Sequence, residues 1–246
     1  MPLRLLCVTA HPDDECFAFG GALALAVERG VEVSVLCLTD GQAATNRGTA
    51  ASGAELGAMR RKEFVESCKL LGIKEYEVLH YQDAQLEFAN FSEVAGLLVE
   101  RLRTWRPDVV LTFGGDGALN THPDHSLVSF FTTAAFHWAG RPKRYPEQLE
   151  RGLQTFCPRR LYFQTTSFLL PDRPPLLPAP YTVTLDIRSV LKKKLAAFAL
   201  HTSQSPLVEK TRPVFEKFGQ SEHYVLAAAS KPQAAAQTTD LFDGLM

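Results

Sequence analysis

Residues 3–15 read Leu3-Arg4-Leu5-Leu6-Cys7-Val8-Thr9-Ala10-His11-Pro12-Asp13-Asp14-Glu15. The first seven residues are mostly apolar, as in a buried β-strand, and the last five place one imidazole beside three carboxylates. A later stretch repeats this plan, because the apolar residues 109–113 are followed by His122-Pro123-Asp124-His125. Two strand ends that carry histidine and aspartate at close spacing predict a metal site with a base beside it, and therefore a hydrolase.

Strands and helices are expected to alternate along the first 140 residues. The pattern predicts strands at 3–9, 31–39, 77–80 and 109–113 and helices at 20–29, 54–71, 92–105 and 123–138, with Ser92 as a helix cap. Near-continuous apolar strands separated by helices are typical of an α/β, Rossmann-like fold, in which a mostly parallel sheet has helices on both faces. No Gly-x-Gly-x-x-Gly follows the first strand, and the glycine-rich residues 114–117 lack that spacing and are only a weak signal for phosphate.

The remaining residues predict a smaller appendage to this core. Residues 161–165, 181–187 and 224–228 have strand-like patterns, residues 190–200 a helical one, and the proline-rich residues 170–180 form an extended loop. We therefore expect one domain, 1–246, with a core at 1–140, a C-terminal extension at 141–230 and a peripheral tail at 231–246. The three lysines at 192–194 are interpreted as a solvated helix face.

Composition narrows the class of protein. The 246 residues are 46% hydrophobic and carry a formal net charge of −1, so nothing indicates a nucleic-acid partner. No apolar run reaches the ~20 residues that span a bilayer, and we expect neither a membrane span nor a signal peptide. The five cysteines are scattered and form no Cys-x-x-Cys, which predicts reduced thiols in a cytoplasmic protein.

The spacing within the two clusters predicts how they bind metal. If the chain turns helical at Pro12, His11 and Asp14 share one face of the helix, as do His122 and His125. The clusters then offer His, Asp and His as three protein ligands and leave a fourth position for water, as in a catalytic zinc site. In a doubly wound sheet the first strand neighbours the fourth, so both clusters should face one crevice.

Asp13 would point away from these ligands and be free to act as a base. The alternative for both clusters is a purely structural one, in which Asp13 or Asp124 caps a helix.

These residues resemble a known family, the LmbE-like or PIG-L-type metal-dependent deacetylases. The resemblance spans residues 3–138, and His201-Thr202-Ser203-Gln204 is similar to a further family feature. It rests on Ala10-His11-Pro12-Asp13-Asp14-Glu15, Thr39-Asp40-Gly41, Arg60-Arg61-Lys62-Glu63, Leu71-Gly72-Ile73 and His122-Pro123-Asp124-His125. It implies an enzyme that uses zinc to remove acyl groups, usually acetyl, from N-acetylglucosamine-type sugars.

The resemblance also implies roles for single residues. His11, Asp14 and His125 correspond to the metal ligands, and Asp13 to the general base. His122 corresponds to a group that stabilises the oxyanion or gives a proton to the leaving amine.

Further residues are expected to support this chemistry. Glu15 is interpreted as a supporting residue, and Asp124 either orients His122 or caps the following helix. His201 is expected to be a structural histidine near the site.

Arg60 and Asp83 are expected to contact the substrate. The alternative for Arg60 is a surface ion pair with Glu63, and the alternative for Asp83 is a structural role in a turn. Some family members carry a tyrosine where this chain has Asn120. An amide side chain is shorter than tyrosine but still donates a hydrogen bond, so Asn120 is also expected to contact the substrate.

The sequence thus predicts a metal-dependent N-deacetylase for a GlcNAc-containing small molecule, such as a thiol-cofactor precursor. One alternative is an amidase that cleaves a larger acyl group from a glucosamine conjugate, and another is a sugar- or nucleotide-binding module without turnover. Fe²⁺ suits the same ligands as Zn²⁺. The sequence leaves a homo-oligomer open.

Overall fold

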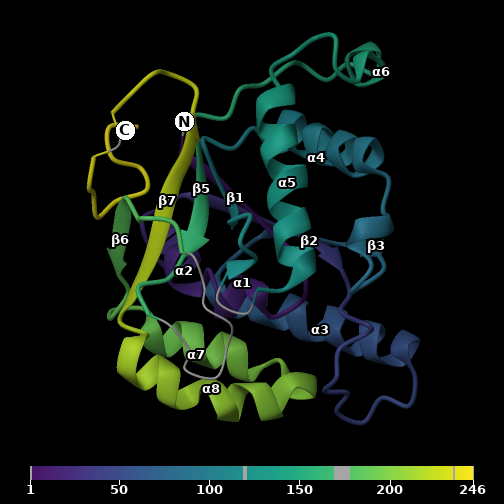
Figure 1. Cartoon of the computed structure of the whole chain (residues 1–246), viewed down its shortest axis with the longest axis vertical. Helices are drawn as coiled ribbons and strands as arrows, with labels where there is room; N and C mark the ends of the chain where they lie inside the picture. The colour runs from purple at the N-terminus through teal and green to yellow at the C-terminus, as the bar shows by residue number, and fades with distance from the viewer. Residues whose placement is uncertain (1, 119–120, 169–177, 235, 246) are drawn as a thin grey trace.

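The computed structural model describes residues 2–118, 121–168, 178–234 and 236–245. Its centre is a seven-stranded sheet in the order β3-β2-β1-β4-β5-β7-β6 (Figure 1). The strands are β1 (Arg4–Thr9), β2 (Glu32–Thr39), β3 (Glu75–Tyr81), β4 (Val109–Phe113), β5 (Arg160–Thr165), β6 (Val183–Asp186) and β7 (Ser221–Ala229). Strands β1 to β5 are parallel, whereas β7 runs antiparallel to β5 and β6.

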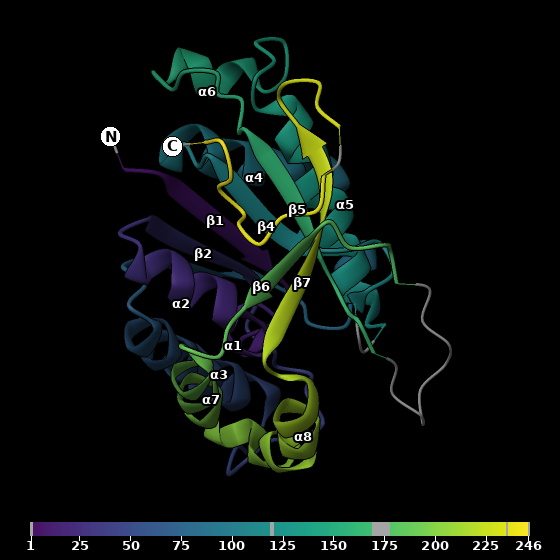
Figure 2. The ribbon, with the colours of Figure 1, turned by 90° about the vertical axis from the view of Figure 1, so that its left-hand side faces the viewer.

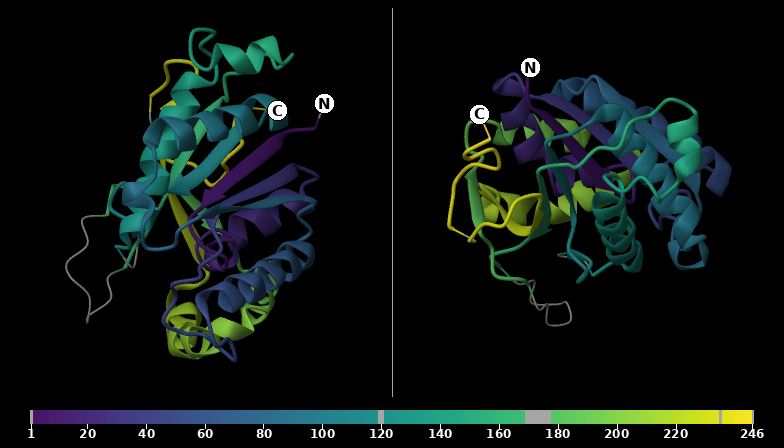
Figure 3. Two further views of the ribbon diagram at one scale, coloured as in Figure 1. Left: turned by 90° about the vertical axis from the view of Figure 1, so that its right-hand side faces the viewer. Right: turned by 90° about the horizontal axis from the view of Figure 1, so that it is seen from above.

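Helices cover both faces of this sheet (Figures 2 and 3). One face carries α1 (Asp14–Phe17), α2 (Gly20–Glu28), α3 (Gly53–Leu71), α7 (Leu191–Ala199) and α8 (Ser205–Phe218). The other carries α4 (Phe91–Trp105) and α5 (Pro123–Trp138), with the short α6 (Pro146–Glu150) at one end. The predicted α/β fold, with a mostly parallel sheet between two helical layers, is confirmed.

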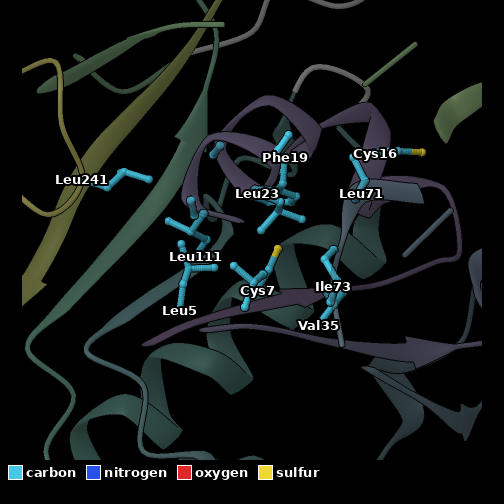
Figure 4. Close-up of a cluster of buried hydrophobic side chains, with 14 of the residues drawn as sticks. Leu5, Cys7, Cys16, Phe19, Leu23, Val35, Leu71, Ile73, Leu111 and Leu241 are labelled. Carbon is cyan, nitrogen blue, oxygen red and sulfur yellow. The ribbon is translucent and has the colours of Figure 1, made fainter. Parts of the chain in front are cut away.

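Each helical layer encloses its own core because alternate residues of a strand point to opposite faces. Leu5 and Cys7 of β1 face α2 and α3, where they meet Leu23 and Leu71 (Figure 4). Leu6 and Val8, their neighbours along the strand, pack with the side chains of α4 and α5 on the opposite face. Strand β1 is therefore buried on both sides, which explains its nearly continuous apolar run.

Helix starts follow local capping chemistry. Helix α3 begins after Ser52, whose side chain accepts from the amide of Glu55. Helix α4 begins after Asn90, whose side chain accepts from the amide of Glu93. The prediction that Ser92 caps this helix is wrong. The helix begins at Phe91, and the residue just before it, Asn90, supplies the capping oxygen.

The C-terminal third differs from expectation in two places. The sequence pattern did not predict helix α8, which contains Pro213 in its interior, where proline usually breaks a helix. The prediction of a peripheral tail does not hold for Leu241 and Phe242. Both are only 2% exposed, and they belong to the same core as Leu5 and Leu23. Most of the expected loop at 170–180 lies outside the described residues.

The lysine run is also different from its interpretation as a solvated face. Lys194 is buried, and its Nζ donates to Oε1 of Glu222 at 2.6 Å. Glu222 also accepts from the amides of Gly21 and Ala22, at the start of α2. This buried pair therefore connects α7, α2 and β7.

No helix among the described residues is long and apolar enough to cross a membrane.

Lys194→Met should destabilise the protein by about 3–5 kcal/mol, because it leaves the carboxylate of Glu222 buried without its cation. The change is measured as the free energy of unfolding in urea. Lys192→Met, on the exposed side of the same helix, is the control and should change stability by no more than about 0.5 kcal/mol. Equal effects of the two substitutions would contradict a structural role for the buried pair.

Candidate metal centre and active site

The two histidine clusters meet where β1 and β4 end. These strands pair in parallel, so the segments that follow them emerge at the same edge of the sheet. After β1 the chain turns tightly, and α1 begins at Asp14 rather than at Pro12 as predicted. Asp13 just before it has φ of 114°, a left-handed conformation that is unusual for a residue with a side chain. This turn directs Asp13 and Asp14 to different sides.

The structure brings together the three predicted metal ligands. His11, Asp14 and His125 are buried, and each offers a ligand atom within 4.8 Å of the others. Oδ1 of Asp14 lies 3.2 Å from Nε2 of His125, and Oδ2 lies 3.6 Å from Nδ1 of His11. The carboxylate thus stands between imidazoles that come from segments more than a hundred residues apart.

His125 is held in an orientation that suits metal binding. Its ring stacks on Phe113 with a centroid distance of 3.8 Å, and its Nδ1 lies 3.2 Å from the carbonyl oxygen of Gly117. Donation from Nδ1 to this carbonyl leaves the lone pair of Nε2 directed at Asp14. Nε2 is buried and has no partner with hydrogen-bond geometry among the described residues. An orphaned imidazole nitrogen beside a carboxylate fits a divalent metal ion. Gly117 belongs to the glycine-rich stretch considered for phosphate, and its carbonyl instead orients His125.

The charges of this cluster are strongly coupled. Burial alone raises the pKa of Asp14, but His125 and His11 outweigh burial and hold that pKa well below its ordinary value. Burial alone lowers the pKa of His11, but hydrogen bonds to Asp124, Asp14 and Asp83 raise it well above 6.5. Without a metal, a proton on His11 therefore balances the carboxylates around it.

His122 caps helix α5 and takes part in a second cluster. Its Nδ1 accepts the amide hydrogen of Asp124 at 3.2 Å, so a neutral ring carries its proton on Nε2. Burial, followed by the charge of His11, lowers the pKa of His122 and favours that neutral form. His11, His122 and Asp124 also offer ligand atoms within 4.8 Å of one another.

Of the two alternatives for Asp124, the helix cap is wrong, because the side chain of His122 caps α5. The carboxylate of Asp124 accepts from the amides of Ala84 and Leu86 and lies 3.3 Å from Nε2 of His11. Asp124 thereby fixes the loop after β3 against the ring of His11.

Asp13 pairs with Arg60 of helix α3. Nη2 of Arg60 donates to Oδ2 of Asp13 at 2.9 Å and to the carbonyl of Pro12, and Nη1 donates to the carbonyl of Gly41 at 3.0 Å. A Cβ atom on Gly41 would lie only 2.1 Å from Nη1, so the guanidinium needs glycine at this position. Arg60 is buried, and the alternative of a surface ion pair with Glu63 is wrong.

The pKa of Asp13 differs from that of an ordinary aspartate. Burial raises it to about 6, while the positive charge of Arg60 acts in the opposite direction. A carboxylate with such a pKa can both accept and release a proton near neutral pH.

Glu15 supports Asp13 from below and is completely buried. Its carboxylate accepts from the amide of Asp13 at 2.9 Å, from Oγ of Ser67 at 2.6 Å and from Nε2 of His201 at 2.9 Å. The contact with His201 joins residues 186 apart, and no local spacing signals it. Sequence reasoning placed His201 near the site, but it missed Ser67 and this network.

Two predicted substrate contacts remain, Asp83 and Asn120. Oδ1 of Asp83 is 3.0 Å from Nε2 of His11, and Oδ2 accepts from the amide of Ala43. Asn120 lies outside the described residues, so its predicted substrate contact stays a prediction.

His125→Ala should abolish tight Zn²⁺ binding, because it removes the nitrogen that faces Asp14. His137→Ala on the same helix is the control and should bind the ion like the unchanged protein. Calorimetric titration of metal-stripped protein measures both. Unchanged affinity in the His125 variant would remove this residue from the ligand set.

Zn²⁺ affinity should keep rising with pH above 6.5, where an ordinary histidine is already mostly neutral. The reason is that the raised pKa of His11 retains a proton that the metal must displace, which costs up to about tenfold in affinity per pH unit for one proton. Competition with a coloured chelator at several pH values measures this dependence. A flat profile above 6.5 would show that His11 binds no extra proton in the metal-free protein.

Comparisons with known proteins agree with this geometry. A family model described as "PIG-L: GlcNAc-PI de-N-acetylase" matches residues 6–136. Diacetylchitobiose deacetylase of Thermococcus kodakarensis is 32% identical over 203 residues, covering 82% of this chain and 70% of the relative. A 1D-myo-inositol 2-acetamido-2-deoxy-alpha-D-glucopyranoside deacetylase of Rhodococcus jostii is 29% identical and covers 98% of each chain.

A solved structure extends the likeness to three dimensions. The N,N'-diacetylchitobiose deacetylase from Pyrococcus horikoshii, complexed with an inhibitor, has a TM-score of 0.73 and 28% identity, covering 90% of this chain and 82% of the other. Because the family model matches the segment that holds both histidine clusters, and the fold agrees, the chain belongs to the PIG-L family of de-N-acetylases.

Proposed function

We propose that this protein is a metal-dependent hydrolase that removes an N-acetyl group from a GlcNAc-containing small molecule. The observation that carries the proposal is Asp13, a buried carboxylate that takes no place among the three ligands yet stands next to them in the chain. The deacetylases among the relatives support the reaction and the amino-sugar class of substrate. The continuity of one sheet through both halves of the chain supports a single domain.

His11, Asp14 and His125 would hold the metal ion, and we propose Zn²⁺, with Fe²⁺ as a second option for the same donors. A bound zinc ion supplies a water whose pKa is lowered to about 7 and polarises a carbonyl group. The carboxylate of Asp14 is kept ionised by its two imidazole neighbours, as a ligand requires.

Asp13 would act as the general base and then as an acid. Its carboxylate accepts a proton from the attacking water and can pass it to the nitrogen of the leaving amine. Arg60 fixes one carboxylate oxygen, and Glu15 fixes the backbone of Asp13 in its left-handed conformation. We therefore propose that Arg60 influences the substrate through Asp13, because both of its terminal nitrogens already donate within the protein.

His122 would stabilise the oxyanion that develops on the scissile carbonyl. Its neutral ring carries a proton on Nε2, and an oxyanion donor of this kind contributes about 2.7–4 kcal/mol. Asp83 lies beside His11, two residues after β3 ends, and we propose that it binds a sugar hydroxyl. Asn120 remains a proposed donor to the same substrate. The free thiols of the described cysteines support the cytoplasm as the proposed location.

A binding module is the alternative from another class. Such a protein has no use for a buried carboxylate with a pKa of about 6 that is oriented by an arginine and placed beside a ligand cluster. The arrangement around Asp13 therefore favours turnover.

Asp13→Asn should leave metal binding intact and lower turnover by about 10²-fold or more, since an amide cannot accept the proton. The measurement is zinc-dependent release of free amine from N-acetylglucosamine conjugates by metal-stripped and reloaded protein. Asp186→Asn, on the exposed edge strand β6, is the matched control and should retain full activity. Full activity in the Asp13 variant would exclude this residue as the base.

A further inference from the structure

A cavity adjoins the ligand cluster, and neither the proton transfer by Asp13 nor the hydrogen bond from His122 uses it. It has a volume of about 80 Å³, and the side chains of Asp14 and His125 form part of its wall. Asp13, Arg60 and Asp83 do not line it. The ligand cluster therefore separates two different environments, a charged one around Asp13 and this cavity.

Aromatic side chains make up much of the cavity wall. Phe17 of α1 meets Phe215 of α8 edge to face at a centroid distance of 5.3 Å. Phe168 and Phe218 stack on each other at 4.4 Å, and Phe113 lies against His125. These rings come from α1, from α8, from the end of β4 and from the segment just after β5, so separate elements of the fold form the aromatic wall.

The polar groups in the wall are mostly engaged with one another. Lys194 pairs with Glu222, and His223 contacts Thr184 and Ser221. Among the described residues of the wall, Oε1 of Gln164 is a buried acceptor without a hydrogen-bond partner. A group that enters the cavity thus meets hydrocarbon on most sides and one open acceptor.

We propose that this cavity receives the acyl group of the substrate and that it accommodates N-acyl chains longer than acetyl as well as acetyl itself. This inference rests on the proposed hydrolase function. An N-acylated amino sugar has a polar sugar on the nitrogen side of the amide and a hydrocarbon chain on the carbonyl side. When the carbonyl reaches the ligand cluster, the first acyl carbons lie beside Asp14 and His125, where the cavity begins.

The size of the cavity supports a chain of several carbons. A volume of about 80 Å³ is several times the ~10–15 Å³ that one water-sized group occupies on the same measure, so a single methyl group fills only part of it. The substrate class then extends from N-acetyl to N-acyl glucosamine conjugates with a longer apolar acyl group. Hydrolysis breaks the C–N bond, adds the water oxygen to the carbonyl carbon and a proton to the nitrogen, and yields a fatty acid and an amine.

The test compares N-acetyl-, N-butyryl- and N-hexanoylglucosamine in two measurements. One is kcat/KM of the zinc-loaded protein, and the other is calorimetric binding to metal-stripped protein, which needs no turnover. Burial of each methylene should improve binding by up to about fourfold until the cavity is filled.

Two matched variants of α8 locate the effect. Val214→Trp places bulk into the cavity and should lower the hexanoyl-to-acetyl ratio of kcat/KM by tenfold or more, on the order of the gain from two methylenes. Glu216→Trp places the same side chain on the exposed side of the helix and should leave the ratio unchanged.

The outcomes separate this inference from the proposed function. Acetyl release with a flat or falling chain-length series would overturn the acyl cavity and leave the deacetylase standing. Chain-length-dependent binding that Val214→Trp weakens, without amine release from any substrate, would support the cavity and contradict the hydrolase. Neither binding nor release would overturn both.

Discussion

The carboxylate of Asp14 stands between the rings of His11 and His125, and the site depends on this placement. One ring follows β1 and the other lies in the first turn of α5, after β4, so their meeting requires parallel pairing of these two strands. Buried imidazoles flanking a buried carboxylate are stable only if their charges balance. A proton or a metal ion provides that balance. The cluster at this edge of the sheet is therefore suited to bind a cation.

Around this cluster the fold separates chemical functions into layers. Asp13 lies on a strained turn and is held by Arg60 and Glu15, which come from α3 and α1. His122 is held by its own helix cap. The side of the cluster that faces α8 is aromatic. Such an arrangement can orient a substrate with one polar and one apolar end. The polar end is favoured on the charged side around Asp13, and the apolar end on the aromatic side that faces α8.

Residues that follow α6 contribute to the site. Helix α7 packs against α1, α2 and α3, and the ion pair of Lys194 with Glu222 connects that helix to β7. His201, directly after α7, supports Glu15 beneath the turn of Asp13. Helix α8 contributes Phe215 and Phe218 to the cavity. Residues 11–125 contain the predicted ligands, whereas α7, α8 and β7 form part of their surroundings.

The sequence by itself determined the alternating layout of the core through its apolar periodicity, and the three-residue spacings of its two clusters predicted His, Asp and His as metal ligands beside a spare carboxylate. It did not reveal helix α8, the burial of Lys194 and Leu241, or the contact of Glu15 with His201. Those features depend on residues that are far apart in the chain, and their proximity is decided by packing free energy rather than by local pattern. The role of Asp124 and the location of the aromatic cavity were likewise decided only by the tertiary structure, since both arise where separate elements meet.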